Sequence, residues 1–398
     1  MDALTTPLPK DWEIKTFRDI STINQGLQIP ISQRLKAPTE HAKFYITIQA
    51  LNNRKEFEYI KTYNESVVCH KDDILMTRTG NTGMVITNIE GVFHNNFFKI
   101  NFDRTLINKD FLVYFLSLEQ TQKTILRKAG TSTIPDLNHN DFYSLSIPLP
   151  SLNEQIAIAN ILSGLDRYLY ALDALILKKE GVKKALSFEL LSQRKRLKGF
   201  NQAWQRVRLG TYKYRRGSFP QPYGNPQWYS DNGMPFVQVY DVGENFKLTQ
   251  KTKQKISKIA QPMSVFVPKN SVIITLQGTI GRVALTQYDC YCDRTILIFD
   301  NNTLNDVNKY FFVLSLFTKF EEEKRKADGS IIKTITKQTL KDFEILLPPL
   351  NEQIAIANIL SDLDSEIISL KNKKRQFENI KKALNHDLMS AKIRVLKK

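Results

Sequence analysis

Two glycine-spaced segments carry the residues best suited to chemistry with a polyanion. Residues 77–85 and 275–283 share the frame T-x-x-G-x-x-G-x-V, and each segment follows a run with strand character. Backbone amides beside closely spaced glycines can bind phosphate, and polar side chains between them can donate to purine edges. No Lys-Ser or Lys-Thr pair follows either frame, which argues against a nucleotide-binding loop. A tight hairpin or a β-bulge is the alternative interpretation.

A second pair of loops recurs farther along each half. Residues 128–132 read KAGTS, and residues 326–330 read KADGS. Small polar residues beside glycine and lysine suit backbone contacts to phosphate, and a helix C-cap at the glycine is an equal alternative. The candidate DNA-contacting residues of the two pairs of loops are Thr77, Arg78, Thr79, Gly80, Asn81, Thr82, Gly83, Thr131, Ser132, Thr275, Gln277, Gly278, Thr279, Arg282 and Ser330.

The balance of charge favours a nucleic-acid partner. The 398 residues include 57 Lys and Arg against 40 Asp and Glu, which gives a formal net charge of +17. An excess of this size is typical of proteins that bind polyanions, although surplus lysine can also serve solubility alone.

Sequence motifs for catalysis or for metal binding are not recognisable. The three cysteines and five histidines have none of the spacings of a metal site, and they predict no disulfide framework. Residues 225–228, NPQW, are only a damaged version of an amino-methyltransferase NPPY loop, and no glycine-rich S-adenosylmethionine loop precedes them. No G-x-S-x-G elbow occurs either. We therefore expect no catalytic residue, no metal and no cofactor in this chain.

One repeated phrase identifies the elements that must position the loops. The twelve residues LNEQIAIANILS occupy positions 152–163 and return 198 residues later at positions 350–361. Apolar residues then recur alternately four and three apart, which predicts two long helices that pack as a coiled coil. Such a period is too long for a solenoid repeat and indicates the duplication of a domain plus a helix.

Four lysines interrupt the apolar stripe of these helices. Lys179 and Lys183 do so in the first copy, and Lys374 and Lys381 do so in the second. Burying an unpaired ammonium group costs several kcal/mol, roughly, so we expect these side chains to extend to solvent or to face a partner.

The sequence thus predicts an α+β protein with two similar globular α/β domains joined by two long antiparallel helices, in a pseudo-twofold internal repeat. The predicted parts are a first domain at 1–150, a first spacer helix at 151–198, a second domain at 199–348 and a second spacer helix at 349–398. The sequence begins with no apolar signal segment and has no apolar run long enough to span a bilayer, so we expect a cytoplasmic protein.

This combination resembles the specificity subunit of Type I DNA restriction–modification systems. The resemblance spans nearly the whole chain and is carried by the helix starts after the proline-containing strands 147–150 and 347–349, the tryptophans Trp12 and Trp204 that open the halves, and the glycine frames. It implies two target-recognition domains that each read one half of a split, asymmetric site in double-stranded DNA. The helices would act as a ruler between the halves.

The same resemblance implies partners for the two helices. Two methyltransferase (modification) subunits, which bind S-adenosylmethionine, would dock there, and restriction–translocase subunits can join them. The candidate docking residues are Asn153, Glu154, Gln155, Asn351, Glu352 and Gln353. The alternative hypothesis is a stand-alone DNA-binding or architectural protein with a coiled-coil spacer.

Overall fold

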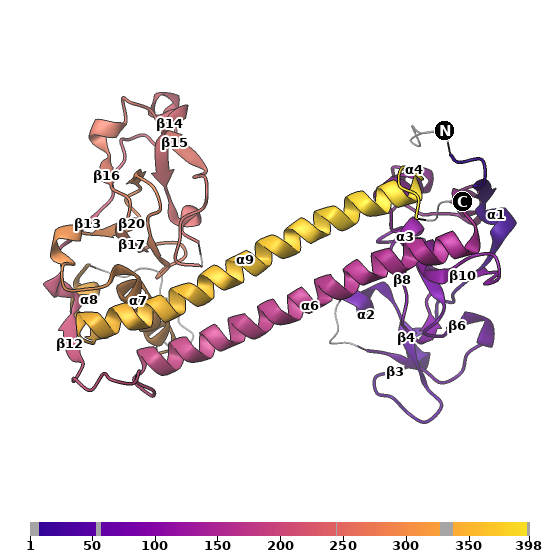
Figure 1. Cartoon of the computed structure of the whole chain (residues 1–398), viewed down its shortest axis with the longest axis horizontal. Coiled ribbons are helices and arrows are strands. Elements are labelled where there is room, and N and C mark those ends of the chain that lie inside the picture. The colour runs from indigo at the N-terminus through magenta and orange to yellow at the C-terminus, as the bar shows by residue number, and fades with distance from the viewer. Residues whose placement is uncertain (1–7, 53–56, 244, 327–336, 396–398) are drawn as a thin grey trace. The chain divides into compact units, whose positions relative to one another are not determined.

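The chain forms two compact units, seen in the computed structural model of Figure 1. The structure describes residues 8–52, 57–243, 245–326 and 337–395. The first unit comprises Met1–Ala174 and Lys371–Lys398, and the second comprises Leu175–Leu370. Each unit contains one globular domain and a segment of each of two long helices.

The long helices are α6 (Leu152–Leu191) and α9 (Leu350–Met389), each a continuous run of 40 residues. Neither contains proline, and both are rich in Ala, Leu, Lys and Glu, which favour helix. At 1.5 Å per residue, each is about 60 Å long. Their apolar stripes are buried, so the predicted pair of long helices is confirmed. Buried members of the stripes are Ile158, Leu162, Leu172, Ile176, Leu190, Ile356, Leu360, Ile367 and Leu388.

Within each unit the two helices pair in opposite directions. In the first unit, the early part of α6 contacts the late part of α9, and the ring centroids of Tyr168 and Phe377 lie 4.7 Å apart. In the second unit, the late part of α6 contacts the early part of α9 through Lys179 and Glu366, whose charged atoms lie 2.8 Å apart. The helices are therefore antiparallel.

The four interrupting lysines all have a carboxylate partner on the opposite helix. Besides the Lys179 pair, Lys374 lies 2.7 Å from Asp173, and Lys381 and Lys183 bind Asp166 and Asp364 respectively. We expected these lysines either to extend to solvent or to face a partner. They face carboxylates of the other long helix, so the partner belongs to the same chain.

The first globular domain combines several β-sheets with short helices. Its four-stranded antiparallel sheet has the order β2 (Ser21–Gln25), β10 (Phe97–Phe102), β7 (Ile74–Thr77), β8 (Val85–Ile86). Its five-stranded sheet has the order β3 (Arg34–Leu35), β5 (Tyr59–Ile60), β4 (Lys43–Ile46), β9 (Gly91–Phe93), β6 (Val68–Cys69), with β4 and β9 parallel. A separate pair joins β1 (Glu13–Thr16) to β11 (Ser146–Leu149). The helices are α1 (Phe17–Ile20), α2 (Ile48–Asn52), α3 (Lys109–Leu116), α4 (Glu119–Ala129) and α5 (His139–Tyr143), with 3-10 turns at Ile31–Gln33 and Glu65–Val67.

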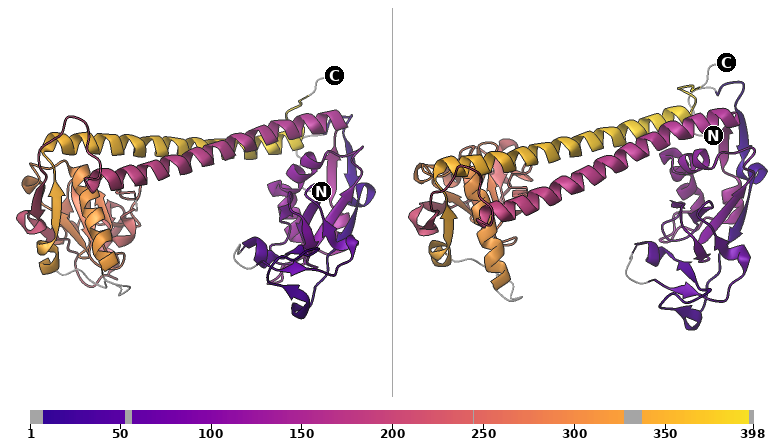
Figure 2. Two further views of the ribbon diagram at one scale, coloured as in Figure 1. Left: turned by 90° about the horizontal axis from the view of Figure 1, so that it is seen from below. Right: turned by 60° about the horizontal axis from the view of Figure 1, so that its bottom comes forward.

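The core of the first domain includes parts of both long helices. Phe17, Phe98 and Phe142 pack with Leu162 of α6 and Leu388 of α9 in one buried cluster. Figure 2 shows the strands and short helices of this domain on one side of the first turns of α6. Each long helix thus belongs to the domain as well as to the helix pair.

The second globular domain repeats this topology, except that the described residues include no counterpart of β3. Its four-stranded sheet has the order β13 (Tyr214–Arg216), β20 (Ile296–Phe299), β17 (Val272–Thr275), β18 (Val283–Leu285). Its other four-stranded sheet has the order β15 (Gln254–Ile256), β14 (Tyr229–Val237), β19 (Cys290–Cys292), β16 (Val265–Val267), with β14 and β19 parallel. A separate pair joins β12 (Gln205–Arg208) to β21 (Glu344–Leu347). The helices are α7 (Lys309–Lys326) and α8 (Lys337–Asp342), with 3-10 turns at Leu209–Thr211, Pro226–Trp228, Val239–Asp241, Gln261–Met263 and Asn301–Thr303. The predicted fold class and internal repeat are confirmed.

Candidate nucleic-acid interface

The first glycine frame is the connection between β7 and β8. The buried hydroxyl of Thr77 donates to the carbonyl of Asn81 and accepts the backbone N–H of Met84 at 2.9 Å, which closes the loop. Gly80 and Gly83 have φ values of +85° and +90°, which strain any residue with a Cβ. A Cβ at Gly80 would also lie 2.5 Å from Cδ1 of Ile48. The tight hairpin, our alternative interpretation, is therefore the local geometry of the frame.

The second frame repeats this construction between β17 and β18. The buried Thr275 hydroxyl donates to the carbonyl of Thr279 and accepts the backbone N–H of Arg282 at 3.0 Å. Gly278 and Gly281 have φ values of +70° and +78°. The two loops therefore share a scaffold of one buried threonine and two glycines.

The loops expose different residues at the same place. In the first loop Gly80 and Asn81 are exposed, and in the second Gln277, Gly278 and Thr279 are exposed. The predicted contact residues of these loops thus include exposed residues, which a ligand can reach, and buried residues, which fix the loop from inside. Those that fix the loop from inside are Thr77, Thr82, Gly83 and Thr275.

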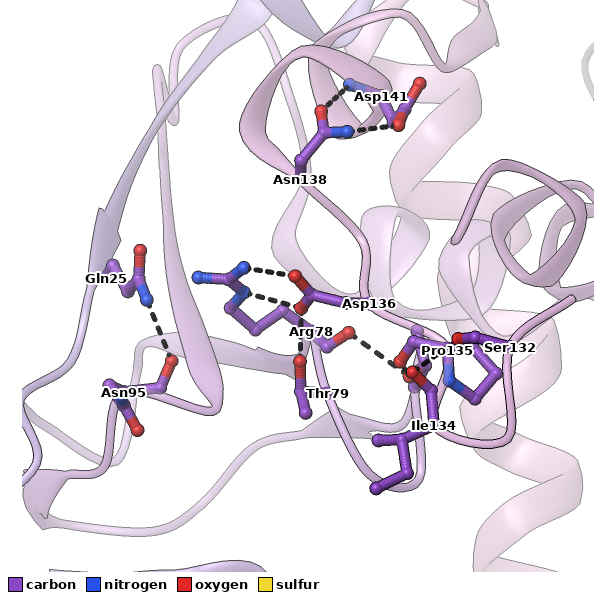
Figure 3. Close-up of polar contacts among 11 residues, drawn as sticks. Gln25, Arg78, Thr79, Asn95, Ser132, Ile134, Pro135, Asp136, Asn138 and Asp141 are labelled. Atoms are coloured by element: carbon purple, nitrogen blue, oxygen red, sulfur yellow. Dashed lines mark hydrogen bonds and ion pairs between the residues drawn. The ribbon is translucent and has the colours of Figure 1, made fainter. Parts of the chain in front are cut away.

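Arg78 is held by an acidic partner in the first domain (Figure 3). Its Nε and Nη2 atoms donate to the Asp136 carboxylate at 3.0 Å and 2.6 Å, and the Thr79 hydroxyl donates to the same carboxylate. The Arg78 guanidinium also lies 5.6 Å from the centroid of the Phe98 ring. Burial raises the pKa of Asp136, but hydrogen bonds from Arg78 and Thr79 and the arginine charge leave it below its usual value.

This contact brings the two predicted loops of the first domain together. Thr82 donates from its hydroxyl to the carbonyl of Pro135 at 2.6 Å, so the glycine loop is tied to residues 135–136. Thr131 and Ser132 are exposed just before that segment, and the Ser132 hydroxyl donates to the Ile134 carbonyl at 2.8 Å. The second-domain counterpart, Ser330, lies outside the described residues.

Arg282 is also engaged within its own domain. Its Nη1 atom donates to the carbonyl of Val242 at 3.1 Å, and the side chain is half-buried. Of the two arginines predicted to read bases, neither therefore points freely into solvent.

Four of the six predicted docking residues are buried and bonded inside the chain. Glu154 accepts from Trp12 Nε1 at 3.2 Å and from Arg394 Nε at 2.7 Å. Glu352 accepts from Trp204 Nε1 at 3.2 Å and from Arg196 Nη2 at 2.6 Å. We call these two sets the Trp–Glu–Arg clusters.

The side chains of the two glutamines in the repeated phrase are also hydrogen-bonded within the chain. Gln155 accepts the backbone N–H of Asn108 at 2.9 Å and donates to the Pro150 carbonyl at 2.9 Å. Gln353 accepts the backbone N–H of Asn308 at 2.9 Å and donates to the Pro348 carbonyl at 2.8 Å. Of the six, only Asn153 and Asn351 are exposed, and a docking role for the set stays a prediction.

Exposed isoleucines on the long helices were missed by the sequence reasoning. Ile156 and Ile161 of α6 are each 38% exposed, and their repeat counterparts Ile354 and Ile359 of α9 are 40% and 36% exposed. The available signal was that the repeated phrase holds more apolar residues than one buried stripe requires. Matching exposure at matching positions marks these residues as a repeated apolar surface.

Two chemical features are absent from the part of the chain that the structure describes. Its histidines, cysteines and carboxylates form no group of three or more that could hold a metal ion. Among the same residues, no helix combines the length and the apolar character needed to cross a membrane.

Comparisons with known proteins point in one direction. The family model described as "Type I restriction modification DNA specificity domain" matches residues 9–180 and 221–379. The putative type I restriction enzyme MjaX specificity subunit of Methanocaldococcus jannaschii is 25% identical, over 98% of this chain and 95% of that protein. The MjaVIII specificity subunit of the same organism is 23% identical, over 98% and 94%.

Solved structures share the fold. The S subunit of a Type I restriction–modification system from M. genitalium has a TM-score of 0.62 at 17% identity, covering 96% of this chain and 98% of that one. The HsdS subunit from Thermoanaerobacter tengcongensis has a TM-score of 0.50 at 20% identity, covering 98% and 99%.

Proposed function

Since the chain belongs to the family of Type I restriction–modification specificity subunits, we propose that it selects the DNA sequence on which a methyltransferase complex acts. In this proposal the domains at 1–150 and 199–348 each read one half of a split, asymmetric site. The segments at 151–198 and 349–398 contain the spacer helices, which end at Leu191 and Met389, and the chain itself is not catalytic. S-adenosylmethionine would bind to the modification subunit.

The pair of glycine loops is the observation that carries this proposal. Both loops keep the buried threonine and the two positive-φ glycines, while the exposed residues change from Asn81 to Gln277 and Thr279. A constant scaffold with variable polar tips suits two domains that read different base sequences. Two recognition domains with different exposed loop residues on one chain favour an asymmetric DNA site.

Mapping of methylated adenine in cells that co-express the chain with a Type I modification subunit tests the proposal. We expect methylation at a split, asymmetric motif that disappears when the chain is omitted. A chain that never associates with a modification subunit would contradict the proposal. Purified chain incubated alone with labelled S-adenosylmethionine and DNA should transfer no methyl group; transfer would assign catalysis to this chain.

The repeated apolar surface supports a docking role for the helices. Exposed isoleucines recur at Ile156 and Ile354 and again at Ile161 and Ile359 with nearly equal exposure. Apolar side chains left uncovered at equivalent places favour two similar partners, one on each copy. We therefore propose that two modification subunits cover them.

Glutamate substitutions test this docking surface. We expect the pair Ile161→Glu and Ile359→Glu to lose co-purification with the modification subunit, because burying two carboxylates in an apolar interface is costly. The matched control is the pair Asn160→Glu and Asn358→Glu, which changes the neighbouring exposed positions. Equal loss of co-purification in both pairs would argue against an apolar contact.

A further inference from the structure

A pocket of about 420 Å3 opens in the first globular domain. Three of its lining side chains are amides, Gln28, Gln49 and Asn96. In the part of the chain that the structure describes, none of these three amide groups has a hydrogen-bond partner. Amides left unpaired around one pocket are available to a ligand, since each offers both a donor and an acceptor.

The ionisable side chains that line the pocket, Arg34 and His94, present no unpaired charge to a ligand. The Arg34 guanidinium donates twice to the carbonyl of Ile29, at 2.8 Å and 2.7 Å, and once to Glu58 at 3.0 Å. Burial, and secondarily the charge of Arg34, lower the pKa of His94, so its imidazole is neutral at pH 7. Its Nδ1 atom accordingly accepts the backbone N–H of Asn96 at 3.2 Å. The pocket therefore presents neutral donors and acceptors.

The pocket adjoins the first glycine loop. The backbone N–H of Arg78 donates to the carbonyl of Asn96 at 2.7 Å. Ile48, another lining residue, lies so close to Gly80 that a Cβ there would approach it within 2.5 Å. A ligand that contacts the exposed loop can thus reach the amides as well.

Structural landmarks locate the corresponding positions in the second domain. A Cβ at Gly26 would lie 2.2 Å from the Phe93 carbonyl oxygen, and a Cβ at Gly217 would lie equally close to that of Cys292. The parallel pair of Ile46 with Phe93 likewise matches the pair of Val237 with Cys292. Counting from these landmarks, the counterparts of Gln28, Gln49 and Asn96 are Phe219, Tyr240 and Thr295.

The second domain does not repeat the free amides. Phe219 is buried at 7% exposure, and the Thr295 hydroxyl donates to Asp293 at 2.6 Å. The Tyr240 hydroxyl donates to the side chain of Gln238. The amide pocket is therefore particular to the first domain, where it can distinguish one half-site from the other.

We propose that this pocket reads adenine in the half-site bound by the first domain. The inference rests on the proposed function and names the base class that one domain selects. A side-chain amide matches the adjacent N6 donor and N7 acceptor of adenine in the major groove. Guanine presents two acceptors there and calls for two donors, as in a free guanidinium, but Arg34 is already held by Ile29 and Glu58.

The test maps methylated adenine in cells that express the full chain with a modification subunit. The variants are Gln28→Ala, Gln49→Ala and Asn96→Ala, together with Gln49→Glu, which keeps the shape of an exposed side chain and removes its donors. The matched control is Gln120→Glu in α4, outside the pocket. We expect at least one pocket variant to relax a single A·T position in one half of the motif. Discrimination against the wrong base there should fall about 5- to 150-fold.

Each of the other possible outcomes of this mapping would contradict one part of the proposal. An unchanged motif in all four variants excludes the pocket as a reader, and an even loss of methylation at all sequences shows a contact without base specificity. Relaxation at a G·C position refutes the choice of adenine. If the unmodified chain directs no methylation, the proposed function itself fails, and that outcome is distinct from the others.

Discussion

The hydroxyl groups of Thr77 and Thr275 have the same task in the two glycine loops. Each donates to the carbonyl four residues ahead and accepts the N–H seven residues ahead. Both side chains are fully buried, so they shape the loop without contacting what the loop binds. At these positions the frame conserves geometry between the halves, and the exposed positions are left to vary.

Replacing Thr77 with valine should weaken the first loop. Valine has a similar shape but leaves the Asn81 carbonyl and the Met84 N–H without their partner, a cost of about 1–3 kcal/mol. The measurement is the free energy of unfolding in urea. Thr77→Ser, which keeps the hydroxyl, is the control and should stay close to the unmodified chain. Equal destabilisation by serine and valine would contradict a role for the hydrogen bonds.

The Arg78–Asp136 pair predicts a dependence on pH. The pKa of Asp136 in the folded chain lies below its usual value of 3.8, so the pair stabilises the folded state above that value. The stabilisation is lost as pH falls through the folded pKa. We therefore expect unmodified chain to exceed Asp136→Asn in unfolding free energy at pH 6, with the difference shrinking by pH 3. A difference that is independent of pH would contradict the ion pair.

Each domain is joined to the helix pair by a tyrosine–aspartate–lysine contact. The Tyr114 hydroxyl donates to Asp166 of α6 at 2.7 Å, and Lys381 of α9 binds the same carboxylate. In the second unit Tyr310 and Lys183 bind Asp364 in the same way. Burial, followed by the aspartate contact, raises the pKa of both tyrosines, so both hydroxyls stay protonated donors.

Asp364 should contribute more to the free energy of unfolding than its neighbour Glu366. Asp364→Asn weakens two charge-assisted contacts at once, a loss of about 1.5–3 kcal/mol. Glu366→Gln weakens one partly exposed pair, which is typically worth about 0.2–1 kcal/mol. Urea unfolding of the two variants checks the order. Equal effects would show that the tyrosine contact adds nothing.

The long helices could be predicted from sequence because heptad spacing is a local property. The pattern predicted a helix start at the repeated phrase, and α6 and α9 begin at Leu152 and Leu350. The partners of Lys183 and Lys381 could not be predicted, because they depend on which residue of the other helix lies opposite. For the same reason Glu154 reads as a surface residue in sequence, although it is buried in the structure and accepts a hydrogen bond from Trp12.

Part of the candidate nucleic-acid interface could be predicted from the sequence. The repeated glycine frame located two loops that the structure builds alike. The amide pocket was not recognisable, because Gln28, Gln49 and Asn96 come from three separate segments of the chain. The pairing of β4 with β9 and the hydrogen bond from the Leu27 N–H to the Phe93 carbonyl bring these segments together.

For the whole molecule, the two halves of the chain complete each other's units. The first unit takes residues 371–398 from the end of the chain, and the second takes residues 175–198 from the first half. The Trp–Glu–Arg clusters follow this rule, since Arg394 binds Glu154 and Arg196 binds Glu352.

Removing Arg394 should therefore destabilise the N-terminal domain. Glu154 is 2% exposed and would keep a buried charge without its cation, so we expect Arg394→Met to cost about 3–5 kcal/mol. Limited proteolysis should then cleave the first domain faster. The control is Lys392→Ala, a nearby cation that is well exposed. If Arg394→Met and Lys392→Ala are cleaved alike, the cluster does not secure the domain.

The exchange of segments has a consequence for synthesis on the ribosome, where domains generally fold as units while the chain emerges. The second unit ends at Leu370, so all its residues are present before translation stops. The first unit lacks Lys381, Leu388 and Arg394 until the whole second unit has been synthesised. The domain that is made first is therefore completed after the second.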